Sequence, residues 1–125
     1  MRKAPIISII DDDLPVREAI EALVRSLGYS AFSFASAEDY LRSCRVQDSS
    51  CLISDLHMPG MSGADLQDRL VADGYHTPII VITAHFEEKV RARILAAGAL
   101  CVLRKPFDNE CLIQCLESAL KISES

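Results

Sequence analysis

The chain has 125 residues, half of them hydrophobic, and this length suits one domain with a substantial buried core. Its 13 basic and 18 acidic residues give a net charge of -5, which argues against direct binding to nucleic acid, because such binding depends on a surplus of Lys and Arg. No apolar stretch approaches the roughly 20 residues of a membrane span, and the apolar run near the start is too short for a signal peptide. We therefore expect a soluble, cytoplasmic protein.

Short apolar runs alternate with amphipathic segments from the start of the chain. Residues 6–10 form the first run, which stops at Asp11, Asp12 and Asp13. The next apolar residues recur at helical spacing, which predicts one buried helix face. These residues are Val16, Ala19, Ile20, Leu23, Val24 and Leu27. Asp13 is a suitable N-cap for this helix, and Gly28 suits its end.

The middle of the chain repeats this alternation. Residues 30–34 indicate a short strand. Ser36 is a plausible N-cap for a second helix, with the acidic residues Glu38 and Asp39 in its first turn. The expected apolar side of that helix consists of Tyr40, Leu41 and Cys44. The apolar run 51–54 stops at Asp55, and Ser62 begins a third helix. The third helix is expected to bury Leu66, Leu70 and Val71.

The last third of the chain continues the pattern. The apolar runs 79–82 and 100–103 stop at Thr83 and just before Lys105, respectively. Residues 87–97 between them predict a helix. A final helix is expected to bury Leu112, Ile113, Leu116, Ala119 and Leu120.

Five strand-and-helix units follow one another, which indicates an α/β fold of the (βα)₅ type. Because most of the expected strands are apolar along nearly their whole length, we expect a parallel sheet that is covered by helices on both faces. Its crossovers should be right-handed. In open sheets of this kind, ligands bind beyond the carboxyl ends of the strands. The polar residues that end the apolar runs are therefore expected to meet at one edge.

These strand ends carry the groups that phosphoryl transfer needs: Asp11, Asp12, Asp55, Thr83 and Lys105. Two adjacent carboxylates at a buried strand end are costly unless a cation shares the site, and Mg²⁺ prefers hard oxygen ligands. A carboxylate can also attack phosphorus as a nucleophile, while cations and hydrogen-bond donors neutralise the phosphoryl oxygens. The pattern predicts a magnesium-dependent site, in which Mn²⁺ could substitute, with Asp55 as the candidate nucleophile.

Four motifs together resemble the signature of two-component response-regulator receiver domains of the FixJ/NarL type. They are I-D-D-D, S-D-L-H-M-P-G-M-S-G, V-I-T-A-H and R-K-P-F at residues 10–13, 54–63, 81–85 and 104–107. The resemblance covers about residues 5–120. It implies a flavodoxin-like (CheY-like) doubly wound sheet with strand order 2-1-3-4-5 and one receiver domain over residues 1–125. It also implies a protein that catalyses only its own phosphorylation and dephosphorylation, and so is not an enzyme in the usual sense.

The resemblance implies roles for the acidic residues. Asp55 matches the phosphoacceptor that takes a phosphoryl group from a histidine kinase. Asp12 and Asp55 match the carboxylate ligands of Mg²⁺, and the backbone carbonyl of His57 matches a third ligand. Asp11 matches the member of the acidic pocket that acts on the metal through water.

Lys105 matches the lysine that pairs with a phosphoryl oxygen, and its peptide bond to Pro106 is expected to be cis. Thr83 matches the hydroxyl that moves toward the phosphoryl group and draws the following loop with it. Many receivers carry an aromatic residue three positions before the lysine, where this chain has Val102. Either the output surface reads backbone shifts alone, or another side chain such as Phe86 substitutes for the missing ring.

Two histidines sit close to the predicted site in sequence. His57 and His85 each follow a predicted site residue by two positions, where the family tunes the access of attacking water. The alternative is that both are exposed loop residues without a special role. His76 is expected to be solvated.

Other functions fit the residues less well. A phosphatase of the haloacid-dehalogenase type usually needs a second acid two residues after the nucleophile, and His57 is there instead. An FMN-binding flavodoxin would need a phosphate loop after the first strand, where three aspartates would repel the phosphate. A phosphorylation-independent interaction module usually lacks one of the acidic pair, the acceptor or the lysine, and this chain keeps them all.

The five cysteines are odd in number and contain no Cys-x-x-Cys pair, so we expect reduced thiols that act as small apolar side chains. The resemblance implies a sensor histidine kinase as partner and no membrane contact. A C-terminal helix-turn-helix output domain beyond this chain would regulate transcription, although a stand-alone receiver fits the residues equally well. Phosphorylation-dependent homodimerisation is a further expectation, weakened by Val102.

Overall fold

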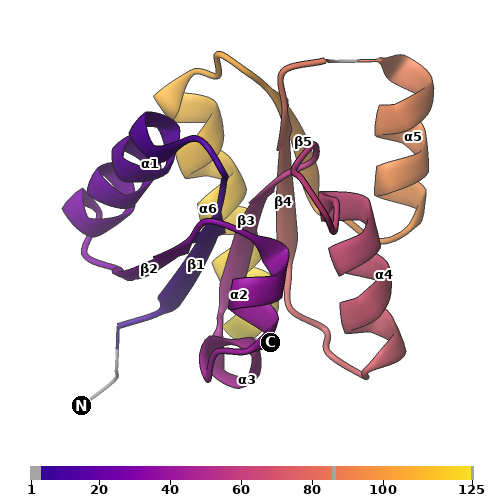
Figure 1. Cartoon of the computed structure of the whole chain (residues 1–125). Coiled ribbons are helices and arrows are strands. Elements are labelled where there is room, and N and C mark those ends of the chain that lie inside the picture. The colour runs from indigo at the N-terminus through magenta and orange to yellow at the C-terminus, as the bar shows by residue number, and fades with distance from the viewer. Residues whose placement is uncertain (1–3, 86, 125) are drawn as a thin grey trace.

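The computed structural model describes residues 4–85 and 87–124. Five parallel strands form one sheet in the order β2-β1-β3-β4-β5 (Figure 1). They are β1 (Ile6–Ile10), β2 (Ser30–Phe34), β3 (Cys51–Asp55), β4 (Ile79–Thr83) and β5 (Cys101–Arg104). This confirms the predicted fold class and strand order. The chain reverses its direction of travel across the sheet between β1 and β3, which is the point where such sheets form ligand sites.

Helices cover both faces of the sheet. The helix bounds are α1 (Leu14–Ser26), α2 (Ala37–Leu41), α3 (Arg45–Asp48), α4 (Gly63–Ala72), α5 (Glu88–Ala96) and α6 (Asn109–Glu124). α1 and α6 pack on one face, and α2 to α5 pack on the other (Figure 1). No described helix is both long and apolar enough to cross a membrane.

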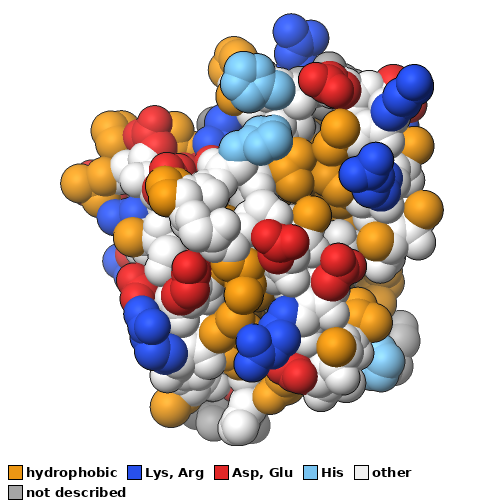
Figure 2. All heavy atoms as spheres, turned by 45° about the vertical axis from the view of Figure 1, so that its right-hand side comes forward, with side chains coloured by type: hydrophobic (Ala, Val, Ile, Leu, Met, Phe, Trp, Pro, Cys, Tyr) orange, Lys and Arg blue, Asp and Glu red, His pale blue; other side chains and the backbone are white. Residues whose placement is uncertain are grey.

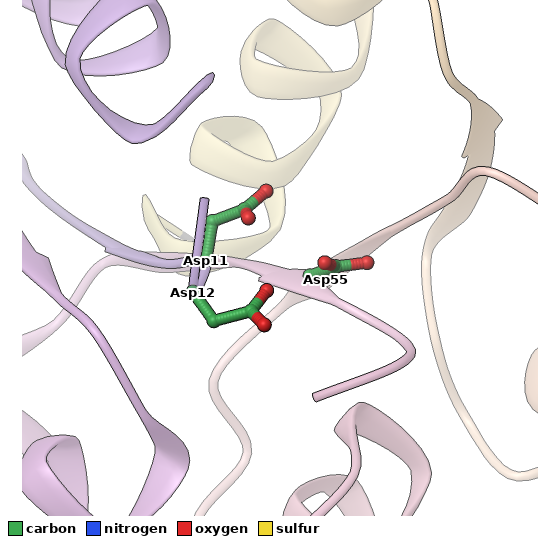
Figure 3. A group of neighbouring side chains, drawn as sticks. All are labelled: Asp11, Asp12 and Asp55. Carbon is green, nitrogen blue, oxygen red and sulfur yellow. The ribbon is translucent and has the colours of Figure 1, made fainter. Parts of the chain in front are cut away.

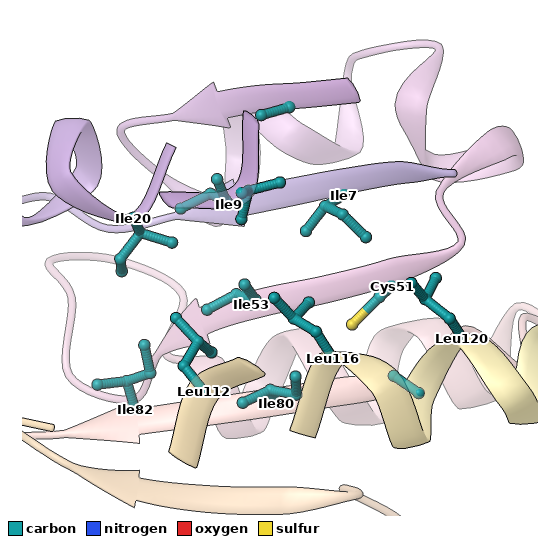
Figure 4. Close-up of a cluster of buried hydrophobic side chains, with 13 residues drawn as sticks. Ile7, Ile9, Ile20, Cys51, Ile53, Ile80, Ile82, Leu112, Leu116 and Leu120 are labelled. Atoms are coloured by element: carbon teal, nitrogen blue, oxygen red, sulfur yellow. The ribbon is translucent and has the colours of Figure 1, made fainter. Parts of the chain in front are cut away.

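The two faces of the sheet bury separate hydrophobic layers. Ile7, Ile9 and Ile53 point toward α1 and α6, where Leu112 and Leu116 close the layer (Figure 4). The residues between them in the strands point toward α2 to α5. Because successive strand residues face opposite sides, a strand covered on both faces must be apolar throughout. This requirement explains the continuous apolar runs in the sequence.

Side-chain caps set the starts of three helices. The Asp13 carboxylate accepts a hydrogen bond from the Val16 amide at 3.4 Å and caps α1. Ser36 caps α2 in the same way. Ser62 and Asp65 form a reciprocal capping box at the start of α4, with bonds of 3.1 and 3.2 Å. These caps fix where the loops above the carboxyl edge give way to helices.

The prediction for the segment after Ser36 was wrong in one respect. α2 ends at Leu41, a separate turn α3 follows, and Cys44 between them is exposed instead of facing the core. The Ser43 hydroxyl donates to the Tyr40 carbonyl at 2.6 Å and accepts from the Arg45 amide at 3.2 Å. Such local side-chain bonds compete with helix continuation.

Two smaller details of the predicted apolar faces were also wrong. Val71 in α4 is 61% exposed, because the buried stripe of this helix runs through Gly63, Leu66, Gln67 and Leu70. Gln67 can take an inward position because its amide donates to the Ile94 carbonyl at 3.4 Å. In α1, Ala19 is exposed at the edge of the face that Ile20 and Val24 bury.

Candidate functional site

Three aspartates meet at the carboxyl edge of the sheet. Asp11 and Asp12 follow β1, and Asp55 ends the neighbouring strand β3 (Figure 3). One carboxylate oxygen of each lies within 4.8 Å of the others. Asp11 and Asp55 are buried, at 1% and 6% exposure, whereas Asp12 is exposed. The parallel register of β1 and β3 brings residues 44 positions apart into one acidic pocket.

Lys105 is the cation of this pocket. It follows β5 in the loop to α6, and its Nζ donates to Asp11 Oδ2 at 2.9 Å and to Asp55 Oδ2 at 3.1 Å. Its peptide bond to Pro106 is cis, as predicted. One ammonium thus faces three carboxylates, so the pocket keeps an excess of negative charge.

The electrostatic balance of the pocket shows in two pKa values. Burial and then the charge of Asp11 raise the pKa of Asp55, against the opposing effect of Lys105. Burial alone would lower the pKa of Lys105, but its hydrogen bonds to Asp11 and Asp55 outweigh burial and raise it. When a carboxyl group is buried beside another carboxylate, its ionised form is unfavourable, and an added cation stabilises that form. The donor set, all carboxylate oxygens, fits a hard divalent ion such as Mg²⁺.

Several contacts position the Asp11 backbone and side chain. The Asp11 carboxylate accepts from the Asp13 amide at 2.9 Å, and its backbone carbonyl accepts from the Arg17 guanidinium at 2.7 Å. The Asp11 amide donates to the Phe34 carbonyl at 3.2 Å. The Asp11 backbone is therefore held by bonds to α1 and β2, while the Asp13 amide orients its side chain.

Gly63 is a site-positioning residue that sequence reasoning missed. It begins α4, and its amide donates to the Leu56 carbonyl at 2.9 Å. A β-carbon on Gly63 would lie 2.6 Å from the Asp55 carbonyl oxygen and 3.1 Å from the Leu56 Cα. Only glycine permits this approach of the helix to the Asp55 backbone. Its place directly after the Ser62 cap was visible in the sequence, but the close approach was not.

Glu38 is a second residue that was missed. This α2 side chain reaches across to the loop between β3 and α4, where its Oε2 accepts from the Met61 amide at 3.3 Å. A β-carbon on Gly60 would lie 2.5 Å from the same oxygen. Glu38 thereby holds the loop that runs from Asp55 to α4. The contact links residues 23 positions apart, and no local sequence signal announces it.

Thr83 lies at the end of β4, next to Asp55 at the end of β3, and is 2% exposed. Its hydroxyl accepts from the His85 amide and donates to the His85 carbonyl, both at 3.1 Å. Its own carbonyl accepts from the Lys105 amide at 2.8 Å. In this state the hydroxyl is committed to its own loop, although the backbone ties that loop to the one that carries Lys105.

The two histidines near the site contact one another. The His57 and His85 rings meet edge to face with centroids 5.8 Å apart, and both side chains are exposed. Figure 2 shows two histidine side chains together on one face of the molecule and a third one far from them. The His57 amide also hydrogen-bonds to Asp55. The two loops that flank the pocket are therefore in contact through imidazole rings.

The structure describes two of the three remaining residues that carry a prediction from the sequence. Val102 is half-buried against the layer on the α4 and α5 face. Phe86, the candidate substitute for the missing aromatic ring, lies outside the described residues. His76 is exposed, in line with the prediction.

Comparisons with known proteins agree on one family. A family profile described as the response regulator receiver domain matches residues 7–117. The response regulator protein TodT of Pseudomonas putida is 40% identical over 121 residues, which cover 97% of this chain and 53% of that protein. The transcriptional regulatory protein FixJ of Azorhizobium caulinodans is 34% identical over 114 residues, covering 91% and 54%. The chain thus spans about half the length of these relatives.

Solved structures agree with this family and with the fold. The response regulator StyR has a TM-score of 0.90 at 37% identity, and the match covers 97% of this chain and 61% of that one. The structure titled FixJ-N has a TM-score of 0.84 at 31% identity, covering 97% and 96%. The second match extends over nearly the whole of both chains.

Proposed function

This chain belongs to the response-regulator receiver family, and we propose that Asp55 accepts a phosphoryl group from a phosphohistidine of a sensor histidine kinase. The observation that carries the proposal is the pocket in which Asp11, Asp12 and Asp55 converge and Lys105 bonds to two of them. An Asp55 carboxylate oxygen would attack phosphorus while the bond from phosphorus to the histidine nitrogen breaks. The product is an aspartyl phosphate on this chain and a free histidine on the kinase.

The proposal includes Mg²⁺, with Mn²⁺ as a substitute. Asp12 and Asp55 would hold it through their carboxylates, His57 through its backbone carbonyl, and Asp11 through water. The bound ion would neutralise charge on a phosphoryl oxygen. The excess of carboxylates over ammonium groups in the pocket supports a cation there, since Lys105 alone leaves the Asp55 pKa raised.

Lys105 and Thr83 have complementary roles in the proposal. Lys105 would exchange its bond with Asp55 for one with a phosphoryl oxygen, since its Nζ already lies 3.1 Å from the acceptor carboxylate. Thr83 would turn its hydroxyl toward the phosphoryl group and release the two bonds that it makes to His85. This exchange would pass the chemical change to the loop between β4 and α5.

The partners are proposed on the same basis. A groove of about 400 Å³ between α1 and the loop after β5 has an apolar lining that includes Ile20, Leu23 and Phe107, and it reaches Lys105. An apolar surface beside the acceptor site suits a kinase helix that presents phosphohistidine. We propose that residues 1–125 are one receiver domain and that an output domain in the full-length protein controls transcription in the cytoplasm, as the longer relatives suggest.

Acetyl phosphate with Mg²⁺ tests the proposal directly. Intact-mass analysis should show one added phosphoryl group on the wild type and none on Asp55→Ala. The label should not form when EDTA is present from the start, and it should be sensitive to hydroxylamine, which cleaves acyl phosphates. Labelling that persists in Asp55→Ala, or that never occurs in a folded wild type, would refute the assignment.

A further inference from the structure

Four of the five cysteines gather where α6 crosses the sheet. Cys51 starts β3, Cys101 starts β5, and Cys111 and Cys115 lie one turn apart in α6. Burial raises the pKa of the Cys115 thiol, and a hydrogen bond with Cys101 and the nearby Cys111 thiol raise it further. Burial, followed by the nearby Cys101 and Cys115 thiols, raises the pKa of Cys51. The four thiols thus range from the fully buried Cys51 to the exposed Cys111.

Cys101 and Cys115 are the pair that the fold brings together, since both pack against the hydrophobic layer under α6. Cys101 points toward α6 because successive residues of β5 alternate, and Val102 takes the opposite face. Both thiols are half-buried at the border of the layer under α6. They also line a groove of about 480 Å³, together with Cys111 and the Arg91 side chain of α5. Small reagents can therefore reach the pair from solvent.

We propose that Cys101 and Cys115 form a reversible dithiol–disulfide site that cross-links β5 to α6. In the forward step the two S–H bonds break and one S–S bond forms. Two electrons and two protons pass to an oxidant, either a peroxide that becomes water or a small disulfide that becomes two thiols. A dithiol reductant reverses the step. Disulfides in intracellular proteins are usually of this transient kind.

The geometry favours this pair over the other possible pairings. Cys111 and Cys115 are four residues apart on a helix, where β-carbons lie about 5–6 Å apart. A disulfide needs β-carbons within about 3.5–4.5 Å, so that pairing would distort α6. Cys51 is fully buried and out of reach of reagents. Cys44 is exposed between α2 and α3, which pack on the face of the sheet opposite to α6.

A metal site explains this cluster less well. Among residues 4–85 and 87–124, the group of three metal-ligating side chains whose atoms converge within 4.8 Å is the aspartate pocket, and the thiols do not form such a group.

Burial, followed by the bond to Cys101, raises the pKa of Cys115 to about 12. That thiol is protonated at neutral pH, so its oxidation should be slow there and faster in alkaline solution.

The cross-link would constrain the face made by α5, β5 and α6. It lies at the start of β5, whereas Lys105 follows the end of the same strand. Aspartyl phosphate formation should therefore survive oxidation, while movement of α6 against β5 should not. That second consequence rests on the proposed function, in which phosphorylation changes this face. Oxidation would then uncouple phosphorylation from output.

Diamide treatment of the reduced full chain tests for the disulfide without any phosphorylation. Thiol titration after unfolding should fall from five groups to three, with the loss of two hydrogens in the intact mass. Peptide mapping should join the segment of Cys101 to that of Cys115. Because the bond closes a loop of 15 residues, the unfolding midpoint should rise by about 10 °C. Dithiothreitol should reverse all of these changes.

Matched variants decide the assignment. Cys101→Ser and Cys115→Ser should each abolish the intramolecular bond, whereas Cys44→Ser and Cys111→Ser should keep it. A peptide map that joins Cys111 to Cys115, or disulfides that form only between chains, would overturn the proposal. So would a chain that forms no disulfide with diamide while Cys111 stays fully open to alkylation. All variants should give the circular dichroism spectrum of the wild type when reduced.

A separate measurement addresses the consequence for the output face. Reduced and oxidised protein are phosphorylated with acetyl phosphate, and their masses in solution are compared. We expect both forms to be labelled equally at Asp55. Only the reduced form should dimerise on phosphorylation. A reduced protein that is not labelled contradicts the proposed function and leaves the disulfide result standing. Equal dimerisation of both forms would refute the uncoupling.

Discussion

The chemistry of this protein depends at the residue scale on an uneven balance of charge. Asp11 and Asp55 are buried beside one another, and Lys105 bridges them at 2.9 and 3.1 Å. The ammonium holds the two carboxylates together, but it does not cancel the cost of burying both. The pocket thus favours added positive charge, which is the basis of the proposed metal and phosphoryl binding.

The raised pKa of Asp55 predicts the pH dependence of stability in EDTA. Its carboxylate ionises less readily in the folded chain than in the unfolded chain, so the folded state binds more protons between the two pKa values. Asp55 therefore costs no stability below its unfolded pKa, and its penalty grows as the pH rises through its folded pKa. Asp55→Asn should unfold at a higher temperature than the wild type at pH 7 and should lack this component of the pH profile.

Calorimetric scans from pH 4 to pH 8 can check this prediction. Asp39→Asn is a suitable control, since Asp39 lies on the surface of α2 in a pair with Arg42. Added Mg²⁺ should raise the unfolding temperature of the wild type and of this control, but much less that of Asp55→Asn. A lower stability of Asp55→Asn in EDTA at pH 7 would contradict the charge balance described above.

Removal of Lys105 should preserve metal binding and lower stability. Lys105→Ala keeps all the proposed metal ligands and removes a competing positive charge, so it should bind Mg²⁺ at least as tightly as the wild type. The two buried carboxylates lose a hydrogen-bond donor, which should cost about 1–3 kcal/mol of stability in EDTA. Titration calorimetry and chemical denaturation measure the two effects. Loss of Mg²⁺ binding in a folded variant would show that Lys105 has a different role.

At the scale of elements, the loops at the carboxyl edge are positioned by helices that start close to them. α4 begins one residue after its Ser62 cap, and its first residue, Gly63, touches the Asp55 backbone. Glu38 of α2 holds the same loop from the other side through the Met61 amide. The position of Asp55, the proposed acceptor, therefore depends on two helices as well as on β3.

Gly63→Ala tests the close approach of α4. Alanine favours a helix over glycine by about 1 kcal/mol, but here its β-carbon would meet the Asp55 carbonyl oxygen at 2.6 Å. The loop must shift, so we expect weaker Mg²⁺ binding and slower labelling by acetyl phosphate, at least tenfold. Ser62→Ala is the control: it should cost about 1 kcal/mol of stability and leave labelling nearly unchanged. Normal labelling of Gly63→Ala would show that the loop yields without cost.

At the scale of the whole molecule, stability and chemistry reside in different parts of the fold. The two hydrophobic layers lie between the sheet and its helices, while the polar site lies beyond the ends of the strands (Figures 3 and 4). The layer under α6 supports the sheet from the face opposite to α4 and α5. Damage to this layer should therefore lower stability more than it changes the site.

Leu116→Ala illustrates this separation. Leu116 is fully buried under the centre of the sheet, so its truncation should cost about 2–5 kcal/mol. The folded fraction should still label at Asp55 with a rate close to that of the wild type. Val71→Ala, at a 61% exposed position, should change stability by less than about 0.5 kcal/mol. Urea denaturation measures both, and a large loss for Val71→Ala would restore the inward position that the sequence pattern predicted.

Much of the fold could be predicted from local patterns because those patterns are themselves physical requirements. Continuous apolar runs such as residues 79–82 fit a strand with both faces covered. The Asp13, Ser36 and Ser62 caps are local interactions within three residues, so the sequence displays them. The end of α2 could not be predicted in the same way. The Ser43 hydroxyl bonds that interrupt the helix form in only one of several conformations open to that segment.

The sequence by itself determined which residues stand at the strand ends and hence which groups are available for chemistry: Asp11, Asp12, Asp55, Thr83 and Lys105. Only the tertiary structure decided their present bonds. Lys105 crosses 94 and 50 positions to reach two aspartates, while the Thr83 hydroxyl stays with His85. The approach of Gly63, the hold of Glu38 and the contact of Cys101 with Cys115 belong to the same class. Such contacts join distant segments whose distances are fixed by packing, and no local pattern encodes them.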